Sequence, residues 1–198
     1  MASAAEPIKK SLINEGGYVP AFNVNGETYK GIDRKQQPNW PGWKIIDQYK
    51  RQRAIPKYAV LKNAVLDNLV LDFYNKNFWP KSKAGFLSNQ AFAENYFDFY
   101  FHKPAIAVAA LLEASGTGTL ADAIYYANQN PTETYSKFYN LRVAHYNNNW
   151  MNGSGKNRIY YKPGKGGTQA TQLRRAKSYP ATLATVTPKY NFSSFLNY

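Results

Sequence analysis

Apolar residues recur every three or four positions through most of the chain, which is the spacing of amphipathic helices. The clearest helix start lies at Asn130, Pro131 and Glu133, a cap residue followed by a first-turn proline and a glutamate three positions after the cap. A helix that opens at Pro104 is apolar on every side from Ala105 to Leu112, and this predicts the most buried helix of a bundle. The other predicted helices cover residues 4–14, 45–49, 57–77, 89–101 and 120–128, and the one after Asn130 extends to residue 148.

The segment between the first two helices has a different pattern. Gly16 and Gly17 end the first helix, and residues 18–43 are rich in Gly, Pro and Asn without a helical period. This composition predicts a loop or a small β-hairpin, with Asn25-Gly26 as a tight turn. The fold class is therefore mostly α-helical, with a small loop or hairpin region near the N-terminus.

The last 47 residues form a compositionally distinct extension. Residues 152–198 contain eight Lys and Arg and no Asp or Glu, and glycines and prolines interrupt them repeatedly. We therefore predict a body over residues 1–151 and an irregular basic tail over residues 152–198. If such a tail is ordered, we expect it to lie on the body or on a partner.

Composition narrows the classes of partner and site. The net charge of +13 points to anionic partners such as nucleic acid, lipid head groups or the bacterial wall. Without cysteine and with only two histidines, the chain offers no thiolate or zinc site, so we expect no metal and no cofactor. The N-terminus has no apolar run typical of a signal peptide, and the longest apolar run is too short for membrane insertion.

One set of residues carries candidate chemistry. Glu15 follows the first helix, and Thr28 returns from the hairpin region soon afterwards. Cleavage of a glycosidic bond requires a carboxylic acid that donates its proton to the leaving oxygen. Burial beside aromatic rings and nearness to a helix C-terminus both favour the protonated form of a carboxyl group. Tyr18 and Tyr29 could form the walls of such a site, and Thr28 could position water or a sugar.

The same residues carry a resemblance to a known family. Glu15–Val19 and Gly26–Ile32 resemble the signature of glycoside hydrolase family 108, the lysozyme-like N-acetylmuramidases of phages and Gram-negative bacteria. Trp40–Ile46 and Phe73–Trp79 are similar to later blocks of that family, so the resemblance covers about residues 8–150. It implies a lysozyme-like fold, a peptidoglycan substrate cut at its β-1,4 bond, and Glu15 as the catalytic acid.

The segment after Glu15 departs from the family pattern. Phage-type lysozymes place an aspartate here to hold water or to stabilise positive charge on the sugar, whereas residues 20–26 contain no acid. Asn23 and Asn25 could hold a water or contact the substrate in its place. Near the end of the helix at 89–101, Tyr100 and Phe101 stand where relatives have smaller residues.

Three other carboxylates could replace the missing acid: Glu27, Asp33 and Asp98. We interpret each as a structural carboxylate that is solvated or supports a helix.

These observations favour a peptidoglycan hydrolase, acting as a phage-borne endolysin or a virion-associated lysozyme. Its location would be the phage virion, or the host cytoplasm with delivery to the periplasm and cell wall. The alternative is a catalytically degenerate, lysozyme-like structural protein of the virion that docks to other virion proteins through its tail, residues 152–198. Nucleic acid is not an expected partner, because the basic cluster at Arg174, Arg175 and Lys177 belongs to no recognised nucleic-acid-binding motif.

Overall fold

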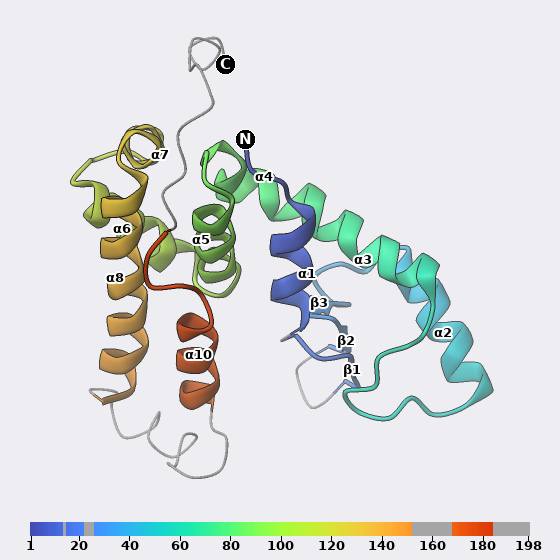
Figure 1. The fold of residues 1–198 in the computed structure, drawn as a ribbon. Coiled ribbons are helices and arrows are strands. Elements are labelled where there is room, and N and C mark those ends of the chain that lie inside the picture. The colour runs from blue at the N-terminus through green and yellow to red at the C-terminus, as the bar shows by residue number, and fades with distance from the viewer. Residues whose placement is uncertain (14, 22–25, 152–167, 184–198) are drawn as a thin grey trace. The chain divides into compact units, whose positions relative to one another are not determined.

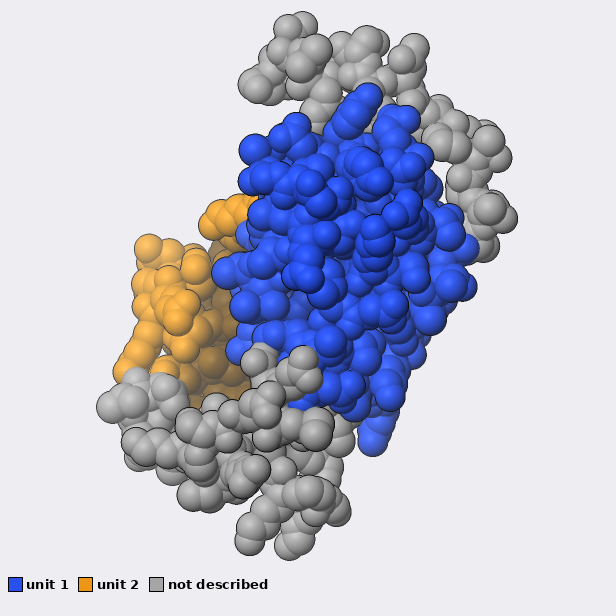
Figure 2. Space-filling model, turned by 90° about the vertical axis from the view of Figure 1, so that its left-hand side faces the viewer, with its two compact units in different colours: residues 1–3, 82–198 blue, residues 4–81 orange. Residues whose placement is uncertain are grey.

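The computed structural model describes residues 1–13, 15–21, 26–151 and 168–183 (Figure 1). Asn23 and Asn25 therefore lie outside the described residues. The chain divides into two compact units, which Figure 2 shows in different colours. The smaller unit is residues 4–81, and the larger is residues 1–3 together with 82–198. The boundary expected at residue 151 stays a prediction.

The smaller unit combines helices with a small antiparallel sheet (Figure 1). Its strands pair in the order β1-β2-β3, with Tyr18 opposite Tyr29 and Thr28 opposite Asp33. The expected hairpin region is thus a three-stranded sheet. The bounds of the elements are α1 (Ala5–Ile13), β1 (Tyr18–Val19), β2 (Thr28–Tyr29), β3 (Ile32–Asp33), α2 (Gly42–Gln52), α3 (Ala64–Asn77) and α4 (Trp79–Ser82), the last of which reaches the unit boundary.

Helix α3 is shorter than the helix predicted over residues 57–77. It begins after Asn63, whose side chain accepts a hydrogen bond from the Leu66 amide at 2.9 Å. This is an N-cap, and it fixes the start of the helix. Residues 57–63 instead form a non-helical segment with Tyr58 in the left-handed region at φ +67°. The helix was predicted to be longer because apolar residues keep a helical spacing through this segment, although its backbone is extended or turned.

The core of the smaller unit joins its helices to the sheet. Helix α1 packs against α3, and Ile8, Leu12, Leu66 and Val70 are buried on these two helices. Helix α2 also packs against α3 and is longer than the predicted helix over 45–49. Helix α3 therefore packs against both α1, after which Glu15 follows, and α2.

The larger unit is helical. Its elements are η1 (Ala84–Phe86), α5 (Gln90–His102), α6 (Pro104–Ser115), α7 (Leu120–Gln129), α8 (Pro131–Met151) and α10 (Thr168–Lys177). Helix α5 is the central one, since every residue from 92 to 99 is buried. The prediction that α6 would be the most buried helix is wrong, because its first turn is exposed and Ile106 is 40% accessible. An all-apolar helix surface shows what can be buried, whereas burial itself depends on how many elements pack around the helix.

Part of the basic extension folds onto the larger unit. Helix α10 packs against α8, and Arg175 donates to both carboxylate oxygens of the buried Asp98 from its Nε at 2.9 Å. Arg142 donates to the same carboxylate. Burial alone would raise the pKa of Asp98, but the charges of Arg142 and Arg175 hold it below its usual value. Residues 168–183 therefore lie on the body, as an ordered tail was expected to do.

Within the described residues, no single helix is long and apolar enough to cross a bilayer, and α6 and α7 meet that test only as a pair bent by 51°.

Candidate functional site

Glu15 lies at the junction of three elements of the smaller unit. It follows α1, is half-buried, and its amide donates to the Leu12 carbonyl at 3.3 Å. Its carboxylate rests over Gly31, because a Cβ built on Gly31 would lie 3.2 Å from Glu15 Oε2. The same Cβ would lie 2.9 Å from the hydroxyl of Tyr74 on α3. The carboxylate and this hydroxyl therefore meet over the turn between β2 and β3.

That turn is built for this close approach. Lys30 and Gly31 are the two residues between β2 and β3, with φ +50° and +78°. A two-residue hairpin turn with both φ values positive matches the twist of antiparallel strands and favours glycine. Gly31 therefore serves twice, since it adopts the backbone of the turn and leaves room for the carboxylate above it.

Tyr74 is a site residue that the sequence analysis included only as part of the family-like block Phe73–Trp79. Its side chain is buried, and its hydroxyl donates to the Lys30 carbonyl at 2.6 Å. Burial raises the pKa of Tyr74 strongly, and the negative charge of Glu15 raises it further. The phenol therefore keeps its proton and ties α3 to the turn. A tyrosine at a core position could have indicated a polar contact at this site, because a buried hydroxyl needs a hydrogen-bond partner.

The two glycines after Glu15 allow the chain to pass close to a neighbouring loop. A Cβ on Gly17 would overlap the carbonyl group of Ala59. The Tyr18 amide donates to that carbonyl at 2.9 Å, and the Tyr58 amide donates to the Tyr18 carbonyl at 2.6 Å. These bonds hold the loop before α3 against the segment that carries Glu15.

Tyr18 and Tyr29 are both buried, and their expected role as walls of the site stays a prediction. Tyr29 is fully buried, and its hydroxyl accepts a hydrogen bond from the Leu61 amide at 3.2 Å. Tyr18 is buried as well, and its hydroxyl donates to Glu27 at 2.8 Å. Burial, followed by the hydrogen bond to Glu27, raises the pKa of Tyr18 to about 12. Both rings support the sheet from inside, because a hydroxyl can be satisfied within the core as well as by a substrate.

Thr28 is half-buried on β2, where it pairs in register with Val19 and Asp33. It is three residues before Gly31 on the same hairpin, so it belongs to the element over which the Glu15 carboxylate lies.

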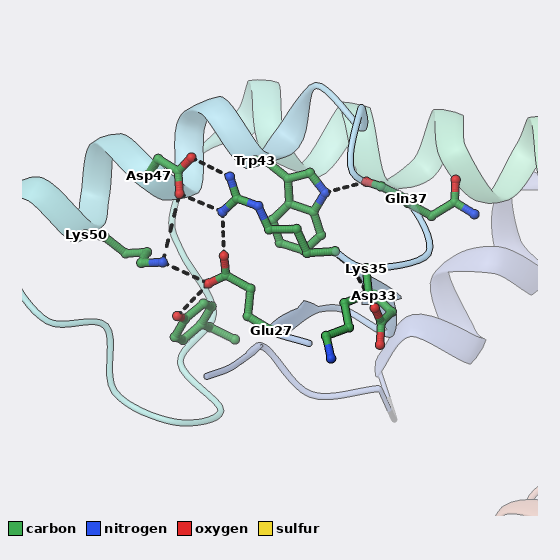
Figure 3. Close-up of polar contacts among 9 residues, drawn as sticks. Glu27, Asp33, Lys35, Gln37, Trp43, Asp47 and Lys50 are labelled. Carbon is green, nitrogen blue, oxygen red and sulfur yellow. Dashed lines mark hydrogen bonds and ion pairs between the residues drawn. The ribbon is translucent and has the colours of Figure 1, made fainter. Parts of the chain in front are cut away.

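Glu27 is the centre of an ion-pair network (Figure 3). The buried carboxylate accepts hydrogen bonds from Arg34 and, at 3.0 Å, from Lys50. Arg34 also forms a bidentate pair with Asp47, at 2.8 and 2.7 Å. The Arg34 guanidinium lies 5.2 Å from the ring centroid of Trp43. The network joins β2 to α2 and packs the hairpin against the body of the unit.

The electrostatics of Glu27 exclude it as a proton donor at neutral pH. Burial alone would raise its pKa, but the hydrogen bonds from Lys50, Arg34 and Tyr18 outweigh burial and hold the pKa below its usual value. Glu27 is therefore ionised and fully engaged in holding the hairpin.

The other two candidate acids also have structural contacts. Asp33 accepts hydrogen bonds from the amides of Lys35 and Gln36, at 2.7 and 3.2 Å, and so caps the turn that follows β3. Asp98 belongs to the larger unit, where two arginines bind it. The interpretation of these carboxylates as structural agrees with their contacts.

Two hollows lie on the smaller unit. One, of about 310 Å³, is lined by Tyr18, Glu27, Arg34 and Lys50 among others. The second, of about 430 Å³, is lined by Tyr49 near the end of α2 and by residues 53–56 and 59–62. Glu15 is not among the residues that line them. In the described part of the chain, no three His, Asp or Glu side chains gather closely enough to hold a metal ion.

Comparison with known proteins adds one match. The model of the family described as Glycosyl hydrolase 108 matches residues 8–103. The matched segment runs from α1 through the sheet to the end of α5, and it includes Glu15, Gly31 and Tyr74. The chain matches none of the curated proteins and none of the solved structures.

Proposed function

Because this chain belongs, over residues 8–103, to glycosyl hydrolase family 108, a family of lysozyme-type peptidoglycan hydrolases, we propose that it is an active N-acetylmuramidase. It would cut the β-1,4 glycosidic bond of the bacterial wall, with Glu15 as the general acid. The proposed chemistry uses the Glu15 carboxyl group and water.

The observation that carries the proposal is the placement of the Glu15 carboxylate. Three elements fix it: the end of α1, the turn at Gly31 and the buried Tyr74. A general acid must be held at one position relative to the bond it protonates, and a carboxylate on a mobile loop would not be. Gly31 makes this position available, and the segment matched by the family model contains both residues.

The proposed reaction uses one carboxyl group and one water. Glu15 gives its proton to the glycosidic oxygen as the bond from that oxygen to the anomeric carbon breaks. Water adds to the anomeric carbon and releases its proton to solvent. The carboxylate of Glu15 then takes up a proton from solvent, which restores the acid.

Thr28 is the proposed positioning residue for that water. Its hydroxyl can accept a hydrogen bond from water and donate one, and it lies on the hairpin over which Glu15 is held. The engagement of Glu27 and Asp33 in structural contacts supports a mechanism in which the water is oriented by neutral groups. Asn23 and Asn25 are further candidates for this task.

The net charge of +13 supports a site of action at the wall, whose polymers are anionic. We propose delivery from a phage virion or from the host cytoplasm. The rival role, docking to virion proteins through the tail, could not use Arg175, which is engaged with Asp98 within the chain, whereas Arg174 and Lys177 on the same helix are exposed.

The test is clearing of purified Gram-negative peptidoglycan, followed as turbidity. Wild type should clear the suspension, and Glu15→Gln should lose clearing by at least 100-fold, because general acid catalysis contributes roughly 10²–10⁴-fold. The matched control is Glu6→Gln on the same helix, whose exposed carboxylate pairs only with Lys9 in the structure and should be dispensable. If wild type, folded by circular dichroism, clears nothing, the proposal of an active enzyme is wrong.

A further inference from the structure

One tyrosine of the smaller unit has an unusual combination of exposure and backbone. Tyr58 is 62% exposed and lies in the loop before α3, with φ +67°. A bulky aromatic residue rarely adopts this left-handed conformation, and such residues persist where the surroundings enforce them, often at binding sites. Because most of its side chain faces solvent, Tyr58 adds little to the core.

The surroundings that enforce this conformation are those that position Glu15. The Tyr58 amide donates to the Tyr18 carbonyl, and a Cβ on Gly17 would lie 2.7 Å from the Tyr58 carbonyl oxygen. The Ala59 carbonyl accepts from the Tyr18 amide on the same stretch. The backbone of Tyr58 is therefore bound to the residues that directly follow Glu15.

The ring itself lies next to Gly16, the residue after the candidate acid. A Cβ on Gly16 would be 3.8 Å from Tyr58 Cδ1, which is ordinary van der Waals contact. Gly16 is the residue after Glu15, so the ring lies against the backbone that carries the acid. The ammonium of Lys57 lies over the same ring, 4.8 Å from its centroid, and places a hydrogen-bond donor at one face of the ring.

An exposed aromatic ring on a hydrogen-bonded backbone suits a carbohydrate ligand. A pyranose presents patches of C–H groups on its faces and hydroxyl and amide groups at its edge. An aromatic ring covers such an apolar patch at low entropic cost because it has few rotatable bonds. A donor beside the ring can then reach the polar edge of the sugar.

We propose that Tyr58 is a sugar-stacking platform that binds an N-acetyl hexosamine of the glycan strand next to the bond over Glu15. This inference rests on the proposed function, since it assigns a substrate contact to the same site. Tyr58 is a binding residue here, and the proton transfer stays with Glu15.

The experiment separates binding from cleavage. Binding to insoluble peptidoglycan is measured by co-sedimentation in the Glu15→Gln background, so that the wall stays intact. Tyr58→Ala should weaken binding by roughly three- to ten-fold, the factor that one aromatic contact supplies, whereas Tyr58→Trp should retain it. Tyr125→Ala, which removes a tyrosine of similar exposure (57%) from the larger unit, should leave binding unchanged.

A second variant distinguishes a ligand contact from a structural role. Tyr58→Gly relieves the left-handed backbone, so it should fold at least as stably as wild type in a thermal melt while binding as weakly as Tyr58→Ala. With Glu15 intact, both variants should raise KM for soluble glycan fragments and leave kcat within about two-fold.

The outcomes are distinguishable. If wild type clears peptidoglycan and the Tyr58 variants bind and turn over like wild type, the platform is wrong and the enzyme stands. If Tyr58→Gly unfolds the protein, the residue is structural and the platform is also wrong. If wild type neither binds nor clears the wall, the proposed function fails together with this inference.

Discussion

Replacing Gly31 by alanine tests the geometry that holds Glu15. Alanine in the left-handed region costs roughly 1–2 kcal/mol for the backbone alone. The new Cβ would also meet the Tyr74 hydroxyl at 2.9 Å and Glu15 Oε2 at 3.2 Å, and crowding of this kind costs about 1–3 kcal/mol more. We expect Gly31→Ala to lower the free energy of unfolding by about 2–5 kcal/mol in total.

Gly116 provides a matched control. It has φ +68°, close to the +78° of Gly31, but a Cβ there would have no neighbour within 4 Å. Gly116→Ala should therefore cost only the backbone part, about 1–2 kcal/mol. Urea unfolding followed by circular dichroism measures both variants, and the difference between them reports the crowding around Glu15.

Activity gives the second measurement for the same pair. Displacing a catalytic group by about 1 Å can cost roughly 100-fold in rate, so Gly31→Ala should clear peptidoglycan 10- to 100-fold more slowly at a temperature where it is folded. Gly116→Ala should clear it at the wild-type rate. The reasoning would be refuted if the two variants were equally stable and equally active, because Gly31 would then not confine the carboxylate.

Three further predictions follow from buried polar groups. Tyr74→Phe should cost about 1 kcal/mol in urea unfolding and slow clearing, because the turn loses its tie to α3. Glu27→Gln should cost about 2 kcal/mol and reduce activity only through loss of the folded hairpin, so added osmolyte should restore clearing. Asp98→Asn should cost about 3–5 kcal/mol, since it leaves two buried arginines without a counter-charge. Because its pKa is depressed in the folded state, the contribution of Asp98 is present above about pH 4 and is lost as the pH falls further, so stability should decline less steeply with acid in the variant than in wild type. An Asp98→Asn protein with wild-type stability at pH 7 would contradict this account of the network.

The local part of the candidate site could be predicted from the sequence. Glu15 and the glycines after it are adjacent in the sequence, so the motif that they form can be recognised without knowing the fold. The structure places this motif at the end of a helix and against a small sheet. The helices with clear caps, such as those after Thr119 and Asn130, also start where the sequence predicts. Capping is a local interaction, so it can be recognised without knowing the rest of the fold.

The other parts depend on contacts between distant segments. Tyr74 reaches the turn from another element 44 residues away from Lys30, and no local pattern identifies that partner. A tyrosine can face either a sugar or the core, so the sequence alone does not decide the surroundings of Tyr18 and Tyr29, which depend on how the folded chain packs. Tyr58 fell within a predicted helix, because helical spacing of apolar residues extends to positions before Asn63, where the helix begins in the structure.

The basic extension shows a similar limit. Helix α10 has few apolar residues, and the segment before it is rich in glycine, so the sequence predicts an irregular tail. What stabilises it is the ion pair between Arg175 and Asp98, whose residues are 77 positions apart. In the sequence, an arginine of a buried ion pair cannot be distinguished from one in a run of surface charges until its partner is known.

The most direct test of the central claim is the analysis of digestion products formed in water enriched in oxygen-18. The account predicts that wild type releases fragments that end in reducing N-acetylmuramic acid, that this new end carries oxygen-18, and that Glu15→Gln releases none of them. Fragments without the label, or fragments released equally by Glu15→Gln, would contradict it, because the glycosidic bond would then be broken without the addition of water or without Glu15 as the acid.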